Sequence, residues 1–471
     1  MPDLMPSPEL GAPVRVRHIL LVTRSFPPLN VVSSLRMYQW AKYWSREGVR
    51  VTVLTTRKHW FSGPCDLDWP PLPHVNVVEV EFLPEVVLRW LERWQGKWTQ
   101  PAAPGRSQAH AATSRLVRVK SWLRRQRLSL RLLPSFEFYD LWIGSAVRAG
   151  RRIIANDAVD VVVSSFGPPA AHWIGGRLKQ QFPDLLWVAD YRDPWTFHDG
   201  YELRSLTGHV ERRRERHLVG RHADLIVCVS GPLADQSRRY VNVPVTVIEN
   251  GFDPEEQARP AAPTALPEQV RALWAPLTLV YAGTFHAEYQ DPAPLFRAIA
   301  DLVRHDERAH DRLRVLFFGD RHAGLQRLID DSGVAGQVRI VGYVDRPTAL
   351  LAQRQANALI LLENQDSAAR GVLRAKMFEY LQAGRPILGV GFSADTEVGR
   401  ILAEAEVGVA CGSDVDRIRE HLRTLRTCGE FEGFTPRPAV LARYRRDVQA
   451  RRLLRTMETL LAEQTQPRMT A

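Results

Sequence analysis

The sequence has 471 residues, of which 45% are hydrophobic and 24% are charged. This composition excludes a largely disordered chain, and the length predicts two domains of roughly 200 residues each. Lys and Arg number 63 against 52 Asp and Glu, which gives a net charge of +11. Such an excess favours an anionic partner, whether lipid, nucleic acid or a phosphorylated small molecule.

The cysteines and the N-terminal segment exclude further classes of protein. The four cysteines are far apart in the sequence and form no Cys-x-x-Cys pair, so neither a zinc site nor a disulfide framework is indicated: Cys65, Cys228, Cys411 and Cys428. Acids precede a short apolar run near the N-terminus, unlike a signal peptide, and no apolar segment is long enough to span a bilayer. We therefore expect a cytoplasmic protein.

The first half of the chain alternates apolar runs with helical patterns. Residues 16–23 predict a buried strand, Ser33 to Gly48 a helix capped by Ser33, and 49–56 a second strand. Four further strands are expected at 160–165, 185–191, 223–230 and 244–250. This alternation predicts a parallel, doubly wound sheet.

Residues 83–133 interrupt the alternation and predict a helical, basic insertion. Its second segment interleaves Arg and Lys with Leu, Val and Trp. That pattern is typical of a helix lying on an anionic membrane, and equally of a solvated basic helix. The first interpretation would make the protein peripheral at the inner face of the membrane.

The second half repeats the architecture after a Pro- and Ala-rich junction at 253–269. Strands are expected at 277–283, 313–319, 338–344, 358–363, 385–391 and 407–411. We predict an N-terminal domain over 1–252, a C-terminal domain over 253–437, and a helical segment over 438–471 that packs back on the first domain.

Candidate site residues follow strands, because ligands of open α/β sheets gather beyond the carboxyl ends of the strands. Asp190, Arg192 and Asp193 end one strand, where they could form a structural ion pair or contact substrate. The loop before Ser33 could be a Pro-stiffened turn, or could lead an anionic or hydroxyl-rich ligand to the start of a helix.

The second half offers a strand end and a helix. Gly283 and Thr284 are small residues that let a ligand approach the backbone. Glu379 lies among apolar neighbours on a helix that ends at Gly384 and is anchored by Leu373, Met377 and Leu381. It could pair with Lys376 on the same face. A partly buried acid needs a partner, and the two hydroxyls of a ribose would also serve.

Several motifs in this order resemble glycosyltransferase family four. They are Pro27-Pro28 followed by Ser34 and Arg36, then ADYRDPW, VIENGFD, YAGTFH, GYVDRP and KMFEYLQAGRPIL. The resemblance runs from about Val16 to the end of the chain. It implies the GT-B fold, in which two Rossmann-like doubly wound parallel-sheet domains face each other across a cleft. It also implies retaining, metal-independent transfer of a sugar from a nucleotide sugar to a hydroxyl acceptor.

Matched residue by residue, the resemblance implies a donor site in the second domain and an acceptor side in the first. Glu379 would bind the ribose hydroxyls, and Tyr343 and Val344 would lie along the base. The implied donor-binding set is Gly283, Thr284, His286, Tyr343, Val344, Gly371, Val372, Arg374, Lys376 and Glu379. The acceptor-side set is Ser33, Ser34 and Arg36. From their place at a strand end, we expect Asp193 or Asp190 to deprotonate or orient the acceptor hydroxyl and Arg192 to position it.

The expected partners are a UDP- or GDP-sugar donor and a lipid-linked or saccharide acceptor of cell-surface polysaccharide or glycolipid synthesis. We expect no metal, no permanently bound cofactor and no nucleic acid, because the basic residues form no recognisable nucleic-acid module. Two alternatives stay open. A nucleotide-sugar epimerase on the same fold would turn over donor without acceptor. A non-catalytic, membrane-associated assembly partner is suggested by Gly371, where many family members have a glutamate.

Overall fold

The computed structural model describes residues 14–59, 62–63, 65–83, 88, 138–196, 206–256, 265–287, 289–364, 371, 373–429 and 431–465. The predicted insertion at 83–133 lies almost entirely outside the described residues. Within them, the chain divides into two compact units. Unit 1 contains the described residues up to Cys228, Gln236–Thr246 and those from Ala450 on; unit 2 contains Val229–Asp235 and Val247–Gln449. The division into domains at 252/253 and 437/438 stays a prediction.

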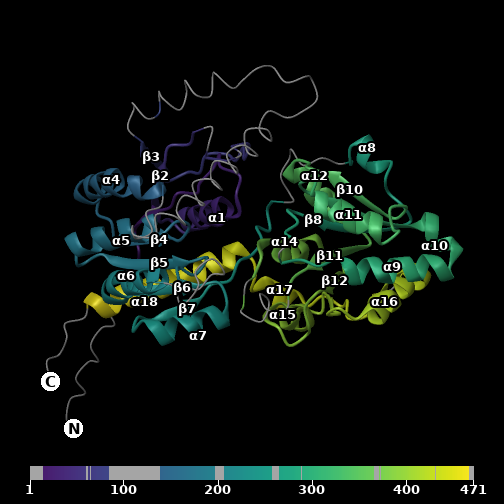
Figure 1. Cartoon of the computed structure of the whole chain (residues 1–471). Helices are drawn as coiled ribbons and strands as arrows, with labels where there is room; N and C mark the ends of the chain where they lie inside the picture. Colours follow the sequence, from purple (N-terminus) through teal and green to yellow (C-terminus); the bar gives the residue numbers. More distant parts are fainter. Residues whose placement is uncertain are drawn as a thin grey trace, which may run out of the picture. The chain divides into compact units, whose positions relative to one another are not determined.

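Unit 1 is built on a sheet whose described strands are ordered β3-β2-β1-β4-β5-β6-β7 (Figure 1). Its strands are His18–Val22 (β1), Arg50–Thr56 (β2), Val75–Val80 (β3), Val161–Ser165 (β4), Leu186–Tyr191 (β5), Leu225–Cys228 (β6) and Val245–Val247 (β7). Its helices are Val32–Arg46 (α1), the short 3-10 helix Phe138–Leu141, Trp142–Asn156 (α4), Ala170–Gln181 (α5) and Leu206–His222 (α6). Helices Gly231–Tyr240 (α7) and Arg446–Thr465 (α18) each contain residues of both units.

The central strands of unit 1 confirm the buried, parallel arrangement expected from their apolar runs. β1 pairs in parallel with β2 and β4, and every residue of β1 and β4 is buried. The strand β3 was missed by the sequence analysis. It pairs with β2 in register Val53↔Val77, and most of its side chains are exposed or half-buried. A half-exposed edge strand lacks the continuous apolar run that marks a buried one.

The predicted cap of the first helix was wrong. α1 begins at Val32, after the extended residue Val31, and no side chain caps it. Ser33 is therefore the second helical residue, and it is buried. From that position its hydroxyl cannot act as a cap, because the capping residue is the one that precedes the first helical residue.

Unit 2 has a sheet of the same topology, with described strands ordered β10-β9-β8-β11-β12-β13. Its strands are Leu277–Ala282 (β8), Leu313–Phe318 (β9), Val338–Gly342 (β10), Ala358–Leu362 (β11), Ile387–Val390 (β12) and Gly408–Ala410 (β13). Its helices are Glu268–Arg271 (α8), Ala293–His305 (α9), Glu307–Arg312 (α10), Ala323–Asp331 (α11), Arg346–Gln355 (α12), Ala375–Ala383 (α14), Glu397–Ala405 (α15), Val415–Cys428 (α16) and Pro438–Ala442 (α17). Counted from its own first strand, the unit 2 sheet has the Rossmann order 3-2-1-4-5-6, and the unit 1 sheet has the same order with β7 as a seventh strand after β6. All six strands predicted in this half are present.

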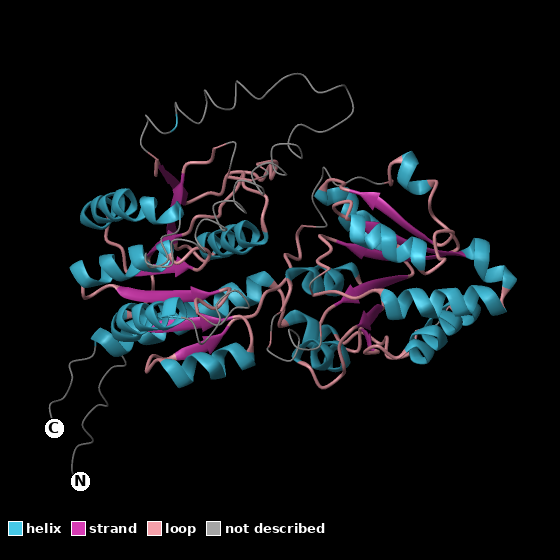
Figure 2. Cartoon of the chain, in the orientation of Figure 1, coloured by secondary structure: helices cyan, strands magenta, loops and turns pink. Residues whose placement is uncertain are grey.

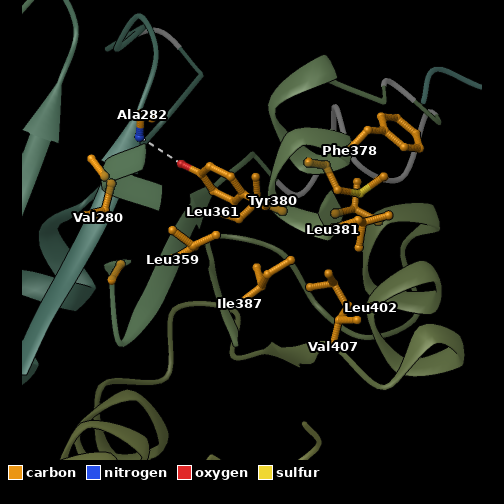
Figure 3. Packing of buried hydrophobic residues seen from close by; sticks show 14 of the residues in the cluster. Val280, Ala282, Leu359, Leu361, Phe378, Tyr380, Leu381, Ile387, Leu402 and Val407 are labelled. Atoms are coloured by element: carbon orange, nitrogen blue, oxygen red, sulfur yellow. Dashed lines mark hydrogen bonds between the residues drawn. The ribbon is translucent and has the colours of Figure 1, made fainter. Parts of the chain in front are cut away.

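Helices cover both faces of the unit 2 sheet (Figure 2). α9, α11 and α16 pack against one face, and α14 and α15 against the other. On the second face, the Tyr380 hydroxyl accepts a hydrogen bond from the backbone N–H of Ala282 at 2.8 Å (Figure 3). The predicted anchors Leu373, Met377 and Leu381 are buried here. α14 ends as predicted at Gly384, which has a left-handed φ of 65°. These contacts fix α14 against the end of β8.

Candidate functional site

The ends of β8, β10 and β11 and the start of α14 bring most of the predicted donor-binding residues together in unit 2. Gly283 and Thr284 follow β8 directly, and both are exposed. The side chain of Lys376 comes from the first turn of α14. Its Nζ lies 3.3 Å from the position that a Cβ on Gly283 would occupy. The glycine therefore lets an ammonium group lie directly against this loop.

Lys376 is a half-buried cation held by an aromatic ring. Its Nζ lies 3.7 Å from the centroid of the Tyr281 ring and donates a hydrogen bond to the Tyr281 hydroxyl. Burial lowers the pKa of Lys376 to about 7, an effect that Glu363 opposes and Arg374 increases. The Tyr281 hydroxyl in turn donates to the carbonyl of Thr284 at 2.9 Å. An anion at this loop would meet an ammonium group whose charge is costly to bury alone.

Arg374 is already neutralised. Its Nε lies 2.6 Å from Oε2 of Glu363, whose side chain is only 2% exposed. Burial raises the pKa of Glu363, and Arg374 opposes that shift. The exposed His286 lies in the loop after β8, where its backbone N–H donates to Gln290. Arg374 is thus paired with a carboxylate, whereas Lys376 has no carboxylate within ion-pair distance among the described residues.

Glu379 has a partner that the sequence analysis missed. Its Oε1 lies 2.6 Å from Nη1 of Arg346, at the start of α12. Arg346 also makes a bidentate pair with Glu256, at 2.6 and 3.0 Å. Oε2 of Glu379 has no hydrogen-bond partner among the described residues, and the side chain is 21% exposed. Arg346 belongs to the GYVDRP motif, so its position in that motif was the available signal.

The alternative pair between Lys376 and Glu379 does not form, since each has another partner. Arg346 lies 33 residues from Glu379 in the sequence. A carboxylate held on one oxygen and open on the other keeps a fixed direction for a ligand. Tyr343 follows β10 in this part of unit 2 and is 54% exposed, while Val344 is half-buried. Val372 lies outside the described residues.

Gly371 has no room for a side chain. Its φ is 78°, in the left-handed region. A Cβ there would lie 2.6 Å from Oγ of Ser230 and 2.9 Å from two side-chain carbons of Pro232. Both conditions favour glycine. The absence of a glutamate at this position therefore has a structural cause in the backbone of unit 2.

In unit 1, the predicted catalytic cluster separates into two ion pairs. Asp190 pairs with Arg36 at 2.9 Å, and both side chains are 0% exposed. Ser165 also donates to Asp190, at 2.8 Å. Asp190 is therefore in a structural ion pair, but its partner is Arg36, which the sequence analysis did not predict. With Ser33 and Ser34 also buried, all three predicted acceptor-side residues have side chains closed off from solvent.

The other pair remains open to solvent. Nη2 of Arg192 lies 2.5 Å from Oδ2 of Asp193, whose side chain is 51% exposed. The same guanidinium group passes over Gly167, where a Cβ would lie 2.7 Å from Nη2. Of the two predicted catalytic carboxylates, Asp193 is therefore the one that a substrate can reach.

Neither a metal-binding cluster nor a membrane-spanning helix is present among the described residues. No group of three or more His, Cys, Asp and Glu side chains in the described part of the chain could hold a metal ion. Within the same residues, no helix combines the length and apolar character needed to cross a bilayer.

Part of the chain matches a known family. Residues 101–256 match the family model Glycosyltransferase Family 4. No curated protein matches the chain.

Solved structures show that the chain has the GT-B fold. It aligns over 95% of its length with all of sucrose-phosphate synthase from Thermosynechococcus elongatus, at 14% identity and a TM-score of 0.59. The corresponding values for a glycosyltransferase from Rickettsia africae are 95% and 99% of the two chains, 12% identity and a TM-score of 0.57. The UDP-forming α,α-trehalose-phosphate synthase from Burkholderia xenovorans aligns over 94% of this chain and 100% of its own, at 11% identity and a TM-score of 0.56. At these identities the likeness shows the fold.

Proposed function

We propose that this chain transfers a sugar from a nucleotide sugar to a hydroxyl acceptor, with retention at the anomeric carbon and without a metal ion. The observation that carries the proposal is the ammonium of Lys376 against the exposed loop at Gly283, with Glu379 one turn further along α14. A phosphate-binding group and a ribose-binding group thus share one short helix. An Anabaena protein of the same fold has been solved with UDP-glucose, at 14% identity, coverage of 95% and 98% of the two chains, and a TM-score of 0.52.

The donor, a UDP- or GDP-sugar, would bind along the strand ends of unit 2. Lys376 meets the diphosphate beside Gly283 and Thr284, and Oε2 of Glu379 accepts from the ribose hydroxyls while Arg346 holds Oε1. The exposed ring of Tyr343 offers a surface for the base, with Val344 beside it in sequence. His286, Arg374 and the backbone at Gly371 and Val372 complete the predicted donor set.

The difficult step is departure of the nucleoside diphosphate while positive charge grows on the sugar. A cation at the diphosphate stabilises the leaving group, and it acts most strongly where water is excluded. Lys376 suits this role, because it is protonated below its pKa of about 7 and is half-buried. This supports transfer without a metal, and we expect activity to persist in the presence of a chelator.

The acceptor hydroxyl would be deprotonated or oriented by Asp193. Its exposed carboxylate is held on one side by Arg192, and the buried pair of Asp190 and Arg36 fixes the strand end from which it projects. We place the acceptor among the lipid-linked or saccharide acceptors of cell-surface synthesis, with the protein peripheral to the membrane. That assignment rests on the resemblance and on the basic sequence at 83–133.

The donor site is tested by thermal shift with a panel of UDP, GDP and their sugars. Wild type should be stabilised by one nucleotide class, and Glu379→Ala should lose that stabilisation. Glu404→Ala is the matched control, because Glu404 pairs with Arg443 at an exposed position of unit 2. If no nucleotide stabilises wild type, the non-catalytic alternative is favoured and the proposal fails.

The acceptor role is tested with Asp193→Asn, which should abolish transfer while leaving nucleotide binding nearly intact, since Asp193 contacts the acceptor only. Full turnover by this variant would remove Asp193 from the mechanism. Consumption of the donor sugar with no acceptor present, and with formation of its epimer, would instead support the epimerase.

A further inference from the structure

Arg24 and Lys58 are partly buried cations of unit 1 that have no carboxylate partner among the described residues. Arg24 lies in the loop after β1, where its Nε is buried without a hydrogen-bond partner. Its guanidinium carbon lies 4.4 Å from the centroid of the Tyr139 ring. Lys58 follows β2, and its Nζ bonds only hydroxyl and carbonyl oxygens of Thr55 and Thr56. Partly buried cations normally have an anion close by, because burial of an uncompensated charge is costly.

The same threonines hold the two cations in one cluster. The hydroxyl of Thr55 donates to the backbone carbonyl of Arg24 at 3.1 Å, while accepting from Nζ of Lys58 at 2.9 Å. Burial lowers the pKa of Lys58 to about 8; Glu79 opposes this shift and Arg24 increases it. The two positive charges therefore act on each other without a neutralising group in contact.

The acids of the neighbouring strand β3 and the residues after it do not pair with the two cations. Glu81 pairs with His59 at 3.0 Å and accepts the backbone N–H groups of Phe82 and Leu83. Glu79 acts on Lys58 through its charge, with no hydrogen bond between them. Among the described residues, neither Arg24 nor Lys58 therefore has a carboxylate in contact.

We propose that Arg24 and Lys58 bind the phosphate group of an anionic acceptor. A phosphate dianion balances two cations and accepts N–H bonds from a planar guanidinium and an ammonium. The cluster lies after the carboxyl ends of adjacent strands β1 and β2, where ligands of open α/β sheets bind. The assignment of this phosphate to an acceptor rests on the proposed function, whereas the phosphate site itself does not.

The site is tested by titration calorimetry with inorganic phosphate. The measurement uses a Lys376→Met background, so that the predicted donor site does not contribute. Arg24→Gln and Lys58→Met should each weaken phosphate binding by about tenfold or more, as expected for loss of a charge-assisted hydrogen bond. Arg57→Gln removes the same charge from the exposed neighbouring residue and should leave binding unchanged.

Two conservative variants separate loss of charge from loss of fold. Arg24→Lys and Lys58→Arg keep the charges and should retain most of the binding. Equal phosphate binding by Lys58→Met and its parent, or no binding by the parent, would overturn the site. Failure of UDP and GDP to bind wild type, with phosphate binding still lost in Lys58→Met, would reject the proposed function and keep the site.

The source of the phosphate is distinguished by two further probes. Binding of glucose 6-phosphate that is lost in Lys58→Met indicates a soluble phosphorylated acceptor. Binding to phosphatidic acid vesicles over phosphatidylcholine vesicles, lost in the same variant, indicates a lipid-linked acceptor. If neither probe depends on Lys58, the assignment of this site to the acceptor is overturned.

Discussion

Arg36–Asp190 in unit 1 and Arg346–Glu379 in unit 2 are both Arg–carboxylate pairs between residues far apart in the sequence, but they differ in exposure. In unit 1, Arg36 and Asp190 are 0% exposed, and Ser165 takes up further bonding capacity of the carboxylate. In unit 2, Arg346 and Glu379 are about one-fifth exposed, and Oε2 of Glu379 has no partner among the described residues. The same chemistry therefore stabilises the scaffold where it is closed, and offers a ligand site where one oxygen stays open.

The closed pair should give the largest effect on stability. Arg36→Met leaves the Asp190 carboxylate buried without its cation, which costs about 3–5 kcal/mol for a fully buried pair. We expect a lower midpoint of urea unfolding, measured by tryptophan fluorescence. Glu379→Ala should leave that midpoint nearly unchanged and weaken nucleotide binding. Such a result would show that the closed pair stabilises the fold and the open pair binds a ligand.

An exposed pair in the same unit is the control for Arg36→Met. Arg50 and Asp157 lie 3.2 Å apart with side chains 63% and 41% exposed. Arg50→Met should cost less than about 1 kcal/mol, because solvent screens such pairs. Similar unfolding midpoints for the two variants would show that burial does not distinguish the pairs.

The next largest effect is expected at Gly371, the position where many family members have a second glutamate. Gly371→Ala adds a methyl group at φ 78° and within 2.9 Å of Ser230 and Pro232 side-chain atoms, so we expect a loss of about 2–4 kcal/mol from strain and overpacking. Gly384→Ala is the matched control, since its φ is 65° and its added Cβ would meet nothing within 4 Å. It should cost only about 1–2 kcal/mol.

The difference between these glycine variants isolates the clash from the backbone strain. Gly371→Glu should likewise destabilise unit 2 and give no new sugar contact. A stable Gly371→Glu variant with tighter donor binding would show that the position can hold the family's glutamate.

The sequence predicted the sheets better than the site. Buried parallel strands such as β1 and β11 are continuous apolar runs and are visible in the sequence, whereas the half-exposed β3 is not. Glu379 stood out because an acid among apolar residues needs a partner. Its partner Arg346 did not stand out, because the two residues are 33 apart in the sequence and only the folded chain brings them together.

The burial of the acceptor-side residues could not be predicted for the same reason. Arg36 and Asp190 are separated by 154 residues, so their mutual burial follows from the parallel packing of strands and α1. A motif gives the order of residues along the chain, but the exposure of each side chain depends on contacts that the order does not contain. The exposed Asp193 and the buried Asp190 differ in this respect while lying three residues apart.

The smallest predicted effect concerns the charge of Lys376, the cation beside the open pair. Burial lowers its pKa to about 7, and a diphosphate binds the protonated form, so affinity should fall as the pH rises above about 7. Because one proton is taken up on binding, the loss of affinity is at most about tenfold per pH unit. The loss ends at the higher pKa that Lys376 has when the anion is bound. The check is the Kd of UDP-glucose between pH 6 and 9. Lys376→Arg keeps its charge throughout this range and should bind with little pH dependence, whereas an unchanged slope in that variant would assign the titration to another group.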